Sequence, residues 1–575
     1  MFVADGERPP DRLDEPGGSL GPMDSPVSPR PFDRAEALER LASEELDVLV
    51  VGGGITGAGV ALDAATRGLR TGLVERDDFA SGTSSKSSKL VHGGLRYLQQ
   101  REIALVYEGL AERQIALRNA PHLVRILPFL IPLFTREGMI SRRLARALGG
   151  ALWMYDLTGG LRIGKRHKRI STDETLSHMQ TLRADRIAGA YLYYDAHTDD
   201  ARLTLTLCRT AAAHGAAVAN YAGVTSLRKD AQGRVCGARL QADGDEVEIR
   251  ARTVVNAAGV WSDDVRALDE ETHPNSIRPA KGIHITVPWS KVRNDIAAVV
   301  PVPKDRRSVF VVPWGDLTYV GTTDTDYEGT LDDPQCTPAD VSYLLNALNA
   351  AITEPVDESD VLGTWAGLRP LLRTAANDRT ADLSRKHAVR RSDSGLVTVT
   401  GGKLTTYRRM AADTVAAVDE ILGKRRRCRT KRLKLLGAEG FEAPPVTNEP
   451  SRHEHLSGRY GTEAVLVDAL VDEEPDLGEA LVPGLPYLKA EAVHAVRHEM
   501  ARTLDDVLTR RTRARLLARD DSAAVAEDVA GLVGRELGWD GAEQARQVKE
   551  YRAAVASERD AADLPETALD TSLGA

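Results

Sequence analysis

This sequence of 575 residues has no long hydrophobic run. None approaches the roughly 20 apolar residues that a helix needs to cross a bilayer. The N-terminus also lacks the apolar core of a signal peptide, so we expect a protein that stays in the cytoplasm. Basic residues are not in excess: the formal net charge is −9, which argues against nucleic acid as the main partner. Cysteine is scarce. The four cysteines lie far apart, without metal or redox spacing, which indicates a reducing compartment: Cys208, Cys236, Cys336 and Cys428.

Glycine, in contrast, stands where a dinucleotide site needs it. Residues 48–51 form an apolar, β-branched run that is typical of a buried parallel strand. In the G-x-G-x-x-G spacing that follows, Gly52 allows a tight turn, Gly54 lets the backbone approach a pyrophosphate, and Gly57 lets helix and strand pack closely. A second strand ends on Glu75, whose carboxylate can accept hydrogen bonds from ribose hydroxyls. The residues predicted to contact a dinucleotide here are Gly52, Gly54, Ile55, Thr56, Gly57, Glu75 and Arg76.

The segment after this unit is unusually dense in small hydroxyl residues, which can hydrogen-bond phosphate and flavin edges without bulk. They are Thr83, Ser84, Ser85, Ser87 and Ser88. His92 follows, and then Gly93 and Gly94 permit close backbone approach to a planar ring. Arg96 and Tyr97 supply a planar cationic fork and a phenol. Serines and glycines alone are equally typical of a polar loop.

Two strings in this region, VGGGITGAGVALDAATRG and SSKLVHGGLRYL, resemble the motifs of the FAD-dependent glycerol-3-phosphate dehydrogenases of the aerobic type. A third string, GGKLTTYRRMA, resembles that family's second motif. It places glycines before a helix N-terminus with Lys403 inside the turn, where N–H groups and the lysine could stabilise negative charge on a reduced flavin. The further predicted cofactor contacts are Val224, Ala257, Gly259, Gly401, Gly402, Lys403, Leu404 and Thr405.

The element order predicts an α/β, two-dinucleotide-binding-domain flavoprotein, like glutathione reductase and D-amino-acid oxidase. A meander at residues 224–249 and a small-residue turn at 257–259 distinguish it from a plain NAD-binding Rossmann domain. We expect a disordered extension at 1–33 and a discontinuous FAD-binding domain at 34–120, 190–269 and 385–423. We also expect an antiparallel β substrate domain at 121–189 and 270–384. A basic linker at 424–435 then leads to a C-terminal helical domain at 436–575.

Residues 140–155 predict a basic amphipathic helix. Ile140, Leu144, Leu148, Leu152 and Tyr155 share one face, with arginines beside them and a tryptophan near the end. Such a helix suits an anionic membrane surface. The competing interpretation is a surface helix that packs this apolar stripe on the core. For the pair His494 and His498, one turn apart, we expect a structural role and no metal, since no carboxylate cluster supports one.

The resemblance implies an activity. The family oxidises sn-glycerol 3-phosphate to dihydroxyacetone phosphate, with hydride passing from C2 to flavin N5 and electrons going on to membrane quinone. The substrate-binding residues that it implies are Arg96, Tyr97, Arg369, Arg385 and Lys403, with Arg96, Arg369 and Lys403 also catalytic. His92 and His284 are both candidates for the base that takes the hydroxyl proton, and their spacing does not choose between them. FAD should be bound non-covalently, and the protein should attach peripherally to the anionic inner face of the cell membrane. The sequence leaves open whether the protein forms a homodimer.

Three other functions also stay open. An oxidase of the same fold would hand the electrons to oxygen. An amine- or amino-acid-oxidising flavoenzyme would share the nucleotide motif without needing so many phosphate-binding arginines. A non-catalytic nucleotide-binding protein could use the basic run to hold RNA.

Overall fold

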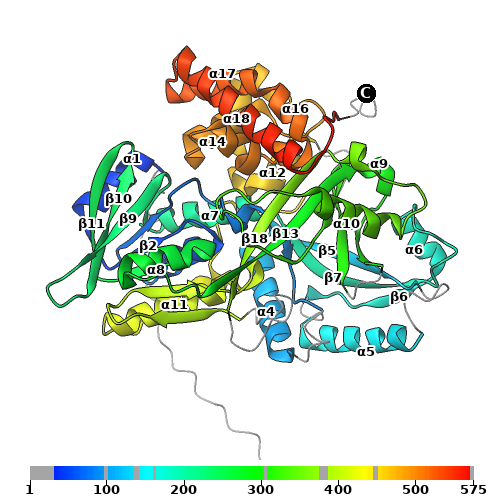
Figure 1. The fold of residues 1–575 in the computed structure, drawn as a ribbon, viewed down its shortest axis with the longest axis horizontal. Coiled ribbons are helices and arrows are strands. Elements are labelled where there is room, and N and C mark those ends of the chain that lie inside the picture. The colour runs from blue at the N-terminus through cyan, green and yellow to red at the C-terminus, as the bar shows by residue number, and fades with distance from the viewer. Residues whose placement is uncertain are drawn as a thin grey trace, which may run out of the picture.

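The computed structural model describes residues 32–95, 102–134, 142–159, 163–303, 307–373, 386–444 and 451–569. Within these ranges the chain forms a nucleotide-binding α/β part, a part built on a ten-stranded sheet, and a C-terminal group of helices (Figure 1). The predicted fold class is confirmed in all three parts.

The nucleotide-binding part is a six-stranded sheet in the order β19-β20-β12-β2-β3-β8. Its strands are β2 (Val48–Val51), β3 (Thr71–Val74), β8 (Ala217–Ala219), β12 (Val254–Asn256), β19 (Ala388–Arg391) and β20 (Val397–Thr400). All neighbours are parallel except β19 and β20. Helix α2 (Ile55–Thr66) packs between α7 (Asp200–Ala213) and α11 (Tyr407–Ile421). Because parallel strands need helices on their faces, this arrangement buries β2 completely.

The predicted meander is confirmed as a four-stranded sheet in the order β1-β11-β10-β9. Its strands are β1 (Glu45–Leu46), β9 (Ala222–Lys229), β10 (Val235–Ala242) and β11 (Asp245–Ala251). The short helix α1 (Arg34–Ser43) packs against both this sheet and β8.

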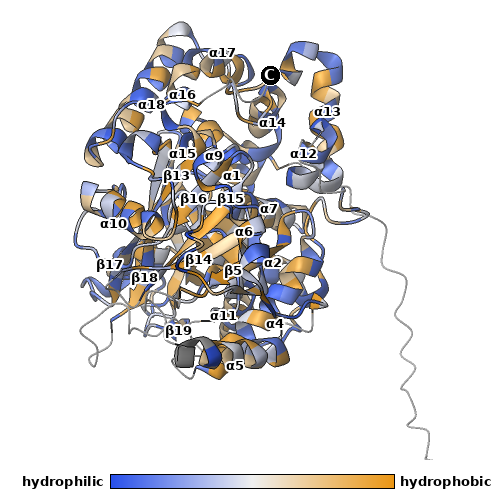
Figure 2. Ribbon diagram, turned by 90° about the vertical axis from the view of Figure 1, so that its right-hand side faces the viewer, coloured by the Kyte–Doolittle hydropathy of each residue, from blue (hydrophilic) through white to orange (hydrophobic). Residues whose placement is uncertain are grey.

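The ten-stranded sheet runs β17-β13-β16-β15-β14-β5-β7-β4, with β18 paired to β13 and β6 to β7. Its long strands are β5 (Val124–Pro132), β7 (Ala190–Thr198), β13 (Ile277–Pro288), β15 (Ser308–Trp314) and β18 (Gly363–Leu372). The shorter ones are β4 (Leu90–Val91), β6 (Lys168–Ile170), β14 (Ala297–Pro301), β16 (Leu317–Gly321) and β17 (Thr325–Asp326). All pairs are antiparallel except β14 with β5. The predicted boundary at residue 190 falls at the start of β7, a strand of this sheet. The strands at its centre are largely hydrophobic (Figure 2).

Helices flank this sheet. They are α4 (Ile103–Asn119), α5 (Arg142–Thr158), α6 (Thr172–His178), α9 (Trp289–Val292) and α10 (Pro338–Asn349), while α8 (Ser262–Glu270) follows β12 in the nucleotide-binding part. The C-terminal helices are α12 (Arg452–Tyr460), α13 (Ala464–Glu473), α14 (Lys489–Glu499), α15 (Ala514–Leu517), α16 (Arg519–Ala524), α17 (Ala526–Leu537) and α18 (Gly541–Ala561). They have a core of their own and lie on the side of the molecule opposite α5 in both views (Figures 1 and 2).

Helix α5 confirms the predicted helix and distinguishes between the two interpretations of its apolar stripe at the residues described, although Ile140 lies outside them. Leu152 and Tyr155 are buried and pack on the core beneath the helix, so the packing interpretation is right for them. The outer face instead carries Trp153, Met154 and Leu157, whose exposed fractions are 48%, 43% and 70%. The helical periodicity of the apolar residues identifies an apolar face, but it does not show which face of the helix packs against the rest of the protein. No helix in the described ranges is both long and apolar enough to span a membrane.

Candidate active site

A cavity of about 1480 Å³ lies where the nucleotide-binding part meets the ten-stranded sheet. Most of the residues predicted from the sequence line it. From the nucleotide motif and the hydroxyl-rich segment these are Gly52, Gly54, Ile55, Thr56, Glu75, Arg76, Thr83, Ser84, Ser87, Ser88, His92 and Gly94. From the rest of the chain they are Val224, Ala257, Gly259, His284, Arg369, Gly401, Gly402, Lys403, Leu404 and Thr405. Arg96, Tyr97 and Arg385 lie outside the described residues.

One end of the cavity is built by the glycine turn. Gly52 has a φ of +110°, and a Cβ on Gly57 would lie 1.9 Å from the Gly52 carbonyl oxygen, so neither position tolerates a side chain without movement. The turn delivers the N-terminus of α2, whose first N–H groups have no acceptor within the helix, to the cavity. The Glu75 carboxylate accepts hydrogen bonds from the N–H groups of Gly53 at 2.6 Å and Asp77 at 3.0 Å. Burial raises its pKa. This end fits a dinucleotide with a ribose near Glu75.

The hydroxyl-rich segment forms the wall beside this turn. Ser84 Oγ accepts the N–H of Ile55 at 2.9 Å, and Thr83 donates to the carbonyl of Leu368 on β18. Not every predicted contact reaches the cavity. Gly57, Ser85 and Gly93 lie behind its wall, where Gly93 donates its N–H to the Tyr155 hydroxyl at 3.0 Å. The two glycines let neighbouring elements approach closely, since a Cβ on Gly57 or Gly93 would lie 1.9 Å from the Gly52 carbonyl oxygen or 2.7 Å from the Leu110 side chain.

The opposite wall is one face of the strand pair β13–β18. In the antiparallel register His284 lies opposite Trp365, Gly282 opposite Gly367, and Ala280 opposite Arg369. The two glycines let other groups approach the strand pair closely: a Cβ on Gly367 would lie 2.3 Å from the Lys86 carbonyl oxygen. A Cβ on Gly282 would lie 2.5 Å from Arg369 Nη2, so the guanidinium extends across the strand at this place.

Arg369 is held in the wall by the segment after β16. Its Nη2 donates to Thr322 Oγ1 at 3.2 Å and to the Thr323 carbonyl at 3.3 Å, while Nη1 lies 3.3 Å from Asp324 Oδ1. The side chains of Arg369 and Asp324 are 22% and 7% exposed. A second arginine that the sequence did not single out, Arg307, also lines the cavity and donates to the Asp324 carbonyl at 2.9 Å.

The two candidate bases have different surroundings. His284 is buried, its Nε2 lies 2.8 Å from Ser88 Oγ, and its ring stacks on Trp365 with centroids 4.7 Å apart and planes at 9°. Burial, reinforced by the charges of Lys89 and Arg369, lowers its pKa well below the usual value, so the ring is neutral near pH 7. His92 is half-buried and packs edge-on against Phe310 at 6.4 Å.

The second glycine turn joins the site from the other half of the chain. Gly401 and Gly402 have φ values of +74° and +78°, and Lys403 precedes the short 3₁₀ turn Leu404–Thr406 that leads into α11. The Thr405 hydroxyl lies 3.0 Å from the His92 backbone nitrogen and 3.2 Å from the His92 oxygen. This contact brings Lys403 and His92 to the same cavity, although 311 positions separate them in the sequence.

The cavity has an apolar extension that the sequence does not reveal. It runs beneath α5 and is lined by Ile131, Ala147, Leu148, Ala151, Val299 and Phe310. These residues come from β5, α5, β14 and β15, four elements that no local pattern links. Trp261, over which the Arg76 guanidinium lies at 5.1 Å, is a further wall residue without a sequence signal.

Comparisons with known proteins show which proteins this chain is similar to. Residues 47–408 match the model of the family described as FAD dependent oxidoreductase, and residues 428–544 match the C-terminal domain of alpha-glycerophosphate oxidase. A glycerol-3-phosphate dehydrogenase of Mycobacterium leprae is 41% identical over 94% of this chain and 92% of its own length. The mitochondrial enzyme of Arabidopsis thaliana with this name is 37% identical, over 94% and 90%.

Solved structures give the same result. The glycerol-3-phosphate dehydrogenase of Bacillus halodurans, solved with FAD, superposes with a TM-score of 0.73 at 32% identity and covers 91% of this chain and 96% of its own. The L-alpha-glycerophosphate oxidase of Mycoplasma pneumoniae, at 17% identity and a TM-score of 0.52, covers 65% of this chain and 95% of its own. It shares the fold.

Proposed function

Because this chain belongs to the family of FAD-dependent glycerol-3-phosphate dehydrogenases, we propose that it oxidises sn-glycerol 3-phosphate to dihydroxyacetone phosphate and passes the electrons to a membrane quinone. The observation that supports this most directly is that His284 and Arg369, from the paired strands β13 and β18, line the same cavity. It offers a proton acceptor and an anion-binding fork beside the cofactor wall.

The residues present fit FAD. The cradle at Gly52 and Gly57 excludes side chains, the N-terminus of α2 faces the cavity, and Glu75 stands at the end of β3. Gly401 and Gly402 would hold the flavin end, with Lys403 supplying positive charge. When bound, FAD supplies the two-electron acceptor that side chains lack.

Arg369 binds the phosphate group in this proposal. A guanidinium presents a planar fork that matches phosphate oxygens, and such charge-assisted hydrogen bonds are stronger than neutral ones. Thr322 and Asp324 fix its direction, which lowers the entropy lost on binding. Arg307, anchored to the same segment, adds a second positive charge to this end of the cavity.

His284 takes the proton of the C2 hydroxyl. Its imidazole is neutral, so a ring nitrogen has a free lone pair, but the burial and the charges of Lys89 and Arg369 that lower its pKa also make it a weaker base than a free histidine. The Ser88 hydroxyl lies 2.8 Å from Nε2. Stacking on Trp365 fixes the plane of the ring. Replacing His284 and His92 in turn by Asn tests which of the two is the base. His284→Asn should slow flavin reduction at saturating substrate about a hundredfold, the lower end of what general base catalysis contributes, and His92→Asn much less. The reverse order would assign the base to His92.

The apolar extension supports a quinone as acceptor. Leu148 and Ala151 of α5 line the same cavity as His92 and Phe310. An apolar ring needs such a path to approach a buried cofactor, whereas oxygen does not.

The outer surface above this extension supports peripheral attachment to the anionic inner face of the membrane. On α5 it exposes Trp153, Met154 and Leu157, and the adjoining α4 exposes Ile103 and Tyr107. Basic side chains border it: Arg146, Lys165 and Arg166 are exposed, and Arg166 lies over the Trp153 ring at 5.3 Å. An apolar face with an aromatic residue and a basic rim is typical of elements that lie in the membrane interface.

An oxidase remains the second candidate, favoured by the match of residues 428–544 to a glycerophosphate oxidase domain. The two are separated by supplying the purified holoenzyme with glycerol 3-phosphate and following oxygen consumption and the reduction of a short-chain quinone in parallel. We expect quinone reduction to be at least a hundredfold faster. Oxygen consumption at the same rate without quinone would establish the oxidase instead.

A further inference from the structure

Three buried arginines join the C-terminal helices to the cofactor site. They belong to the π-helix Asp506–Arg511 and the residues directly after it, and Arg510, Arg511 and Arg513 are 8%, 2% and 0% exposed. A buried guanidinium is costly unless it is fully paired. Their carboxylate partners include Asp78, Asp199 and Asp200, which all belong to the nucleotide-binding part.

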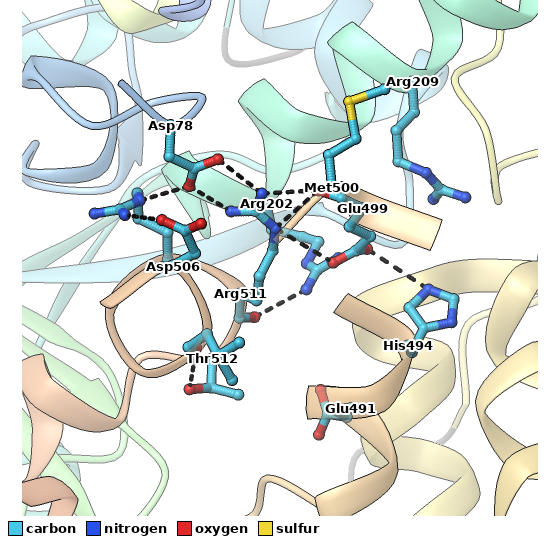
Figure 3. A network of polar contacts seen from close by, with 12 residues as sticks. Asp78, Arg202, Arg209, Glu491, His494, Glu499, Met500, Asp506, Arg511 and Thr512 are labelled. Atoms are coloured by element: carbon cyan, nitrogen blue, oxygen red, sulfur yellow. Dashed lines mark hydrogen bonds and ion pairs between the residues drawn. The ribbon is translucent and has the colours of Figure 1, made fainter. Parts of the chain in front are cut away.

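The first connection reaches the end of β3. Arg511 holds Asp78 in a two-pronged contact, with Nη1 2.6 Å from Oδ2 and Nη2 2.8 Å from Oδ1 (Figure 3). Arg510 Nε adds a third bond to Asp78 at 2.6 Å. Burial favours the neutral carboxyl, but the charges of Arg511 and Arg510 prevail and lower the pKa of Asp78. Asp78 stands three residues after Glu75, which lines the cavity. The segment that carries Glu75 is thus held from the C-terminal side.

The second connection reaches the hydroxyl-rich wall. Arg513 pairs with Asp200 and with Asp199, whose Oδ1 lies 3.0 Å away. The same Asp200 carboxylate accepts three bonds from the wall: the Ser87 N–H at 3.0 Å, the Ser87 hydroxyl at 2.6 Å and the Lys89 ammonium at 3.0 Å. The Asp200 carboxylate therefore links Arg513 directly to Ser87 and Lys89 of the hydroxyl-rich wall.

From this wall the contacts continue to the reacting groups. Trp365 Nε1 donates to the Ser87 carbonyl at 3.2 Å, and the Lys89 ammonium lies 4.8 Å from the Trp365 ring. Trp365 stacks on His284, whose Nε2 meets Ser88 Oγ. Arg513, Asp200, the wall and His284 form one continuous series.

We propose that Arg511 and Arg513 are positioning residues, through which docking of the C-terminal helices fixes the two cofactor-holding segments, residues 75–78 and 83–89, in their binding conformation. In the described part of the chain no residue after Thr405 lines the cavity, so the C-terminal helices act on the cofactor only through such contacts. Stability is a weak explanation for these pairs, because well-packed apolar residues often stabilise a core as well as buried ion pairs do. The proposal rests on FAD as the cofactor and not on the choice of substrate or acceptor.

The test compares Arg513→Lys with a matched control, Arg519→Lys. Both arginines are 0% exposed, but Arg519 pairs with Asp520 and the Pro565 carbonyl within the C-terminal part. A lysine keeps the charge and loses the fork, so it cannot hold Asp199, Asp200 and the Thr509 carbonyl together. FAD affinity of the apoprotein is measured by quenching of flavin fluorescence, and amide hydrogen exchange is followed over residues 83–92 in the holoenzyme.

We expect Arg513→Lys to weaken FAD binding about tenfold, which corresponds to about 1.4 kcal/mol. Exchange should rise at Ser87, whose N–H donates to Asp200, and at Lys89, whose N–H donates to Ser87 Oγ. Arg519→Lys should leave both readouts unchanged, whatever it does to the melting temperature. If Arg513→Lys lowers the melting temperature yet binds FAD as the unaltered protein does, the arginine is structural and the proposal is overturned.

A double-mutant cycle adds a second measurement. If Arg513 acts through Asp200 on Ser87, the losses of FAD affinity in Arg513→Lys and Ser87→Ala must be non-additive, whereas Arg519→Lys and Ser87→Ala must add. Additivity in both cycles would refute the connection. Should Arg513→Lys yield no soluble protein, Arg511→Lys makes the same test through Asp78, with exchange at residues 75–78 as the readout. None of these measurements uses substrate, so their failure is distinct from failure of the proposed activity.

Discussion

Replacing Arg369 by Ala should weaken the enzyme's discrimination for the phosphate group. Arg369 lines the cavity, is 22% exposed, and is aligned by Thr322 and Asp324. A hydrogen bond to a charged group contributes about 1.5–3 kcal/mol. At about 1.4 kcal/mol per factor of ten, kcat/KM for glycerol 3-phosphate should fall about tenfold to about 150-fold. Oxidation of unphosphorylated glycerol, already slow, should change little, and FAD should be retained.

Part of any loss could come from the partner left behind. Asp324 is only 7% exposed, so removing Arg369 leaves a poorly solvated carboxylate in the wall. The double variant Arg369→Ala/Asp324→Asn separates the two causes because it removes this charge as well. If Arg369 reads the phosphate, the double variant is as poor as the single one. Recovery of activity in the double variant would mean that the stranded carboxylate, and not the lost phosphate contact, caused the defect.

The assay is dye-coupled oxidation of both substrates, with Arg278→Ala as the matched control. Arg278 lies on β13, one quarter exposed, and pairs with Asp326 at 2.6 Å, but it does not line the cavity. It should leave both rates unchanged. Equal losses on glycerol and glycerol 3-phosphate in Arg369→Ala would refute the reasoning, because the residue would then serve something other than phosphate recognition.

Three further outcomes follow from the same structure. Gly57→Ala should give a folded protein without bound FAD, since its Cβ would lie 1.9 Å from a carbonyl oxygen. The control Gly531→Ala, in open space on α17, should stay yellow, and a yellow Gly57→Ala would contradict the assignment of this turn to FAD binding. Stability should fall as the pH drops from about 6.5 towards 4, by up to about 1.4 kcal/mol per pH unit for each of two histidines. Loss of solvation lowers the pKa of His122 and of His197 to about 4, so over this range only the unfolded chain takes up the protons; a flat melting temperature would be inconsistent with this. Changing the three exposed apolar residues of α5 to Ser should release the protein from anionic liposomes without loss of dye reduction, and the same change at the exposed pair on α13 should not; continued pelleting would place the membrane contact elsewhere. The α5 residues are Trp153, Met154 and Leu157, and the α13 pair is Val465 and Leu466.

The parts of the site that could be predicted are those encoded locally. Gly52, Gly57 and Glu75 lie within one strand–turn–helix–strand unit, so their spacing alone determines their geometry. The meander and the strand of His284 are equally local. These positions were found from the sequence because each pattern is complete within about 30 residues.

What could not be predicted depends on partners far away in the chain. Arg510 and Asp78 are separated by 432 positions, and the string TRRTRAR is as typical of a solvated helix face as of a buried cluster. The apolar extension beneath α5 combines residues of four elements, so no period records it. Helix α5 carries apolar residues on more than one face, and only the tertiary structure shows that Leu152 packs inward and Trp153 points out.

The most direct test of the proposed function is an anaerobic titration of the purified yellow protein with sn-glycerol 3-phosphate. The visible flavin absorbance should bleach fully, with one dihydroxyacetone phosphate formed per FAD, and adding a quinone should restore the colour. Glycerol and amino acids should leave the spectrum almost unchanged over the same time. Bleaching by an amine or amino acid but not by glycerol 3-phosphate would contradict the account, since the pocket between His284 and Arg369 would then serve a different substrate.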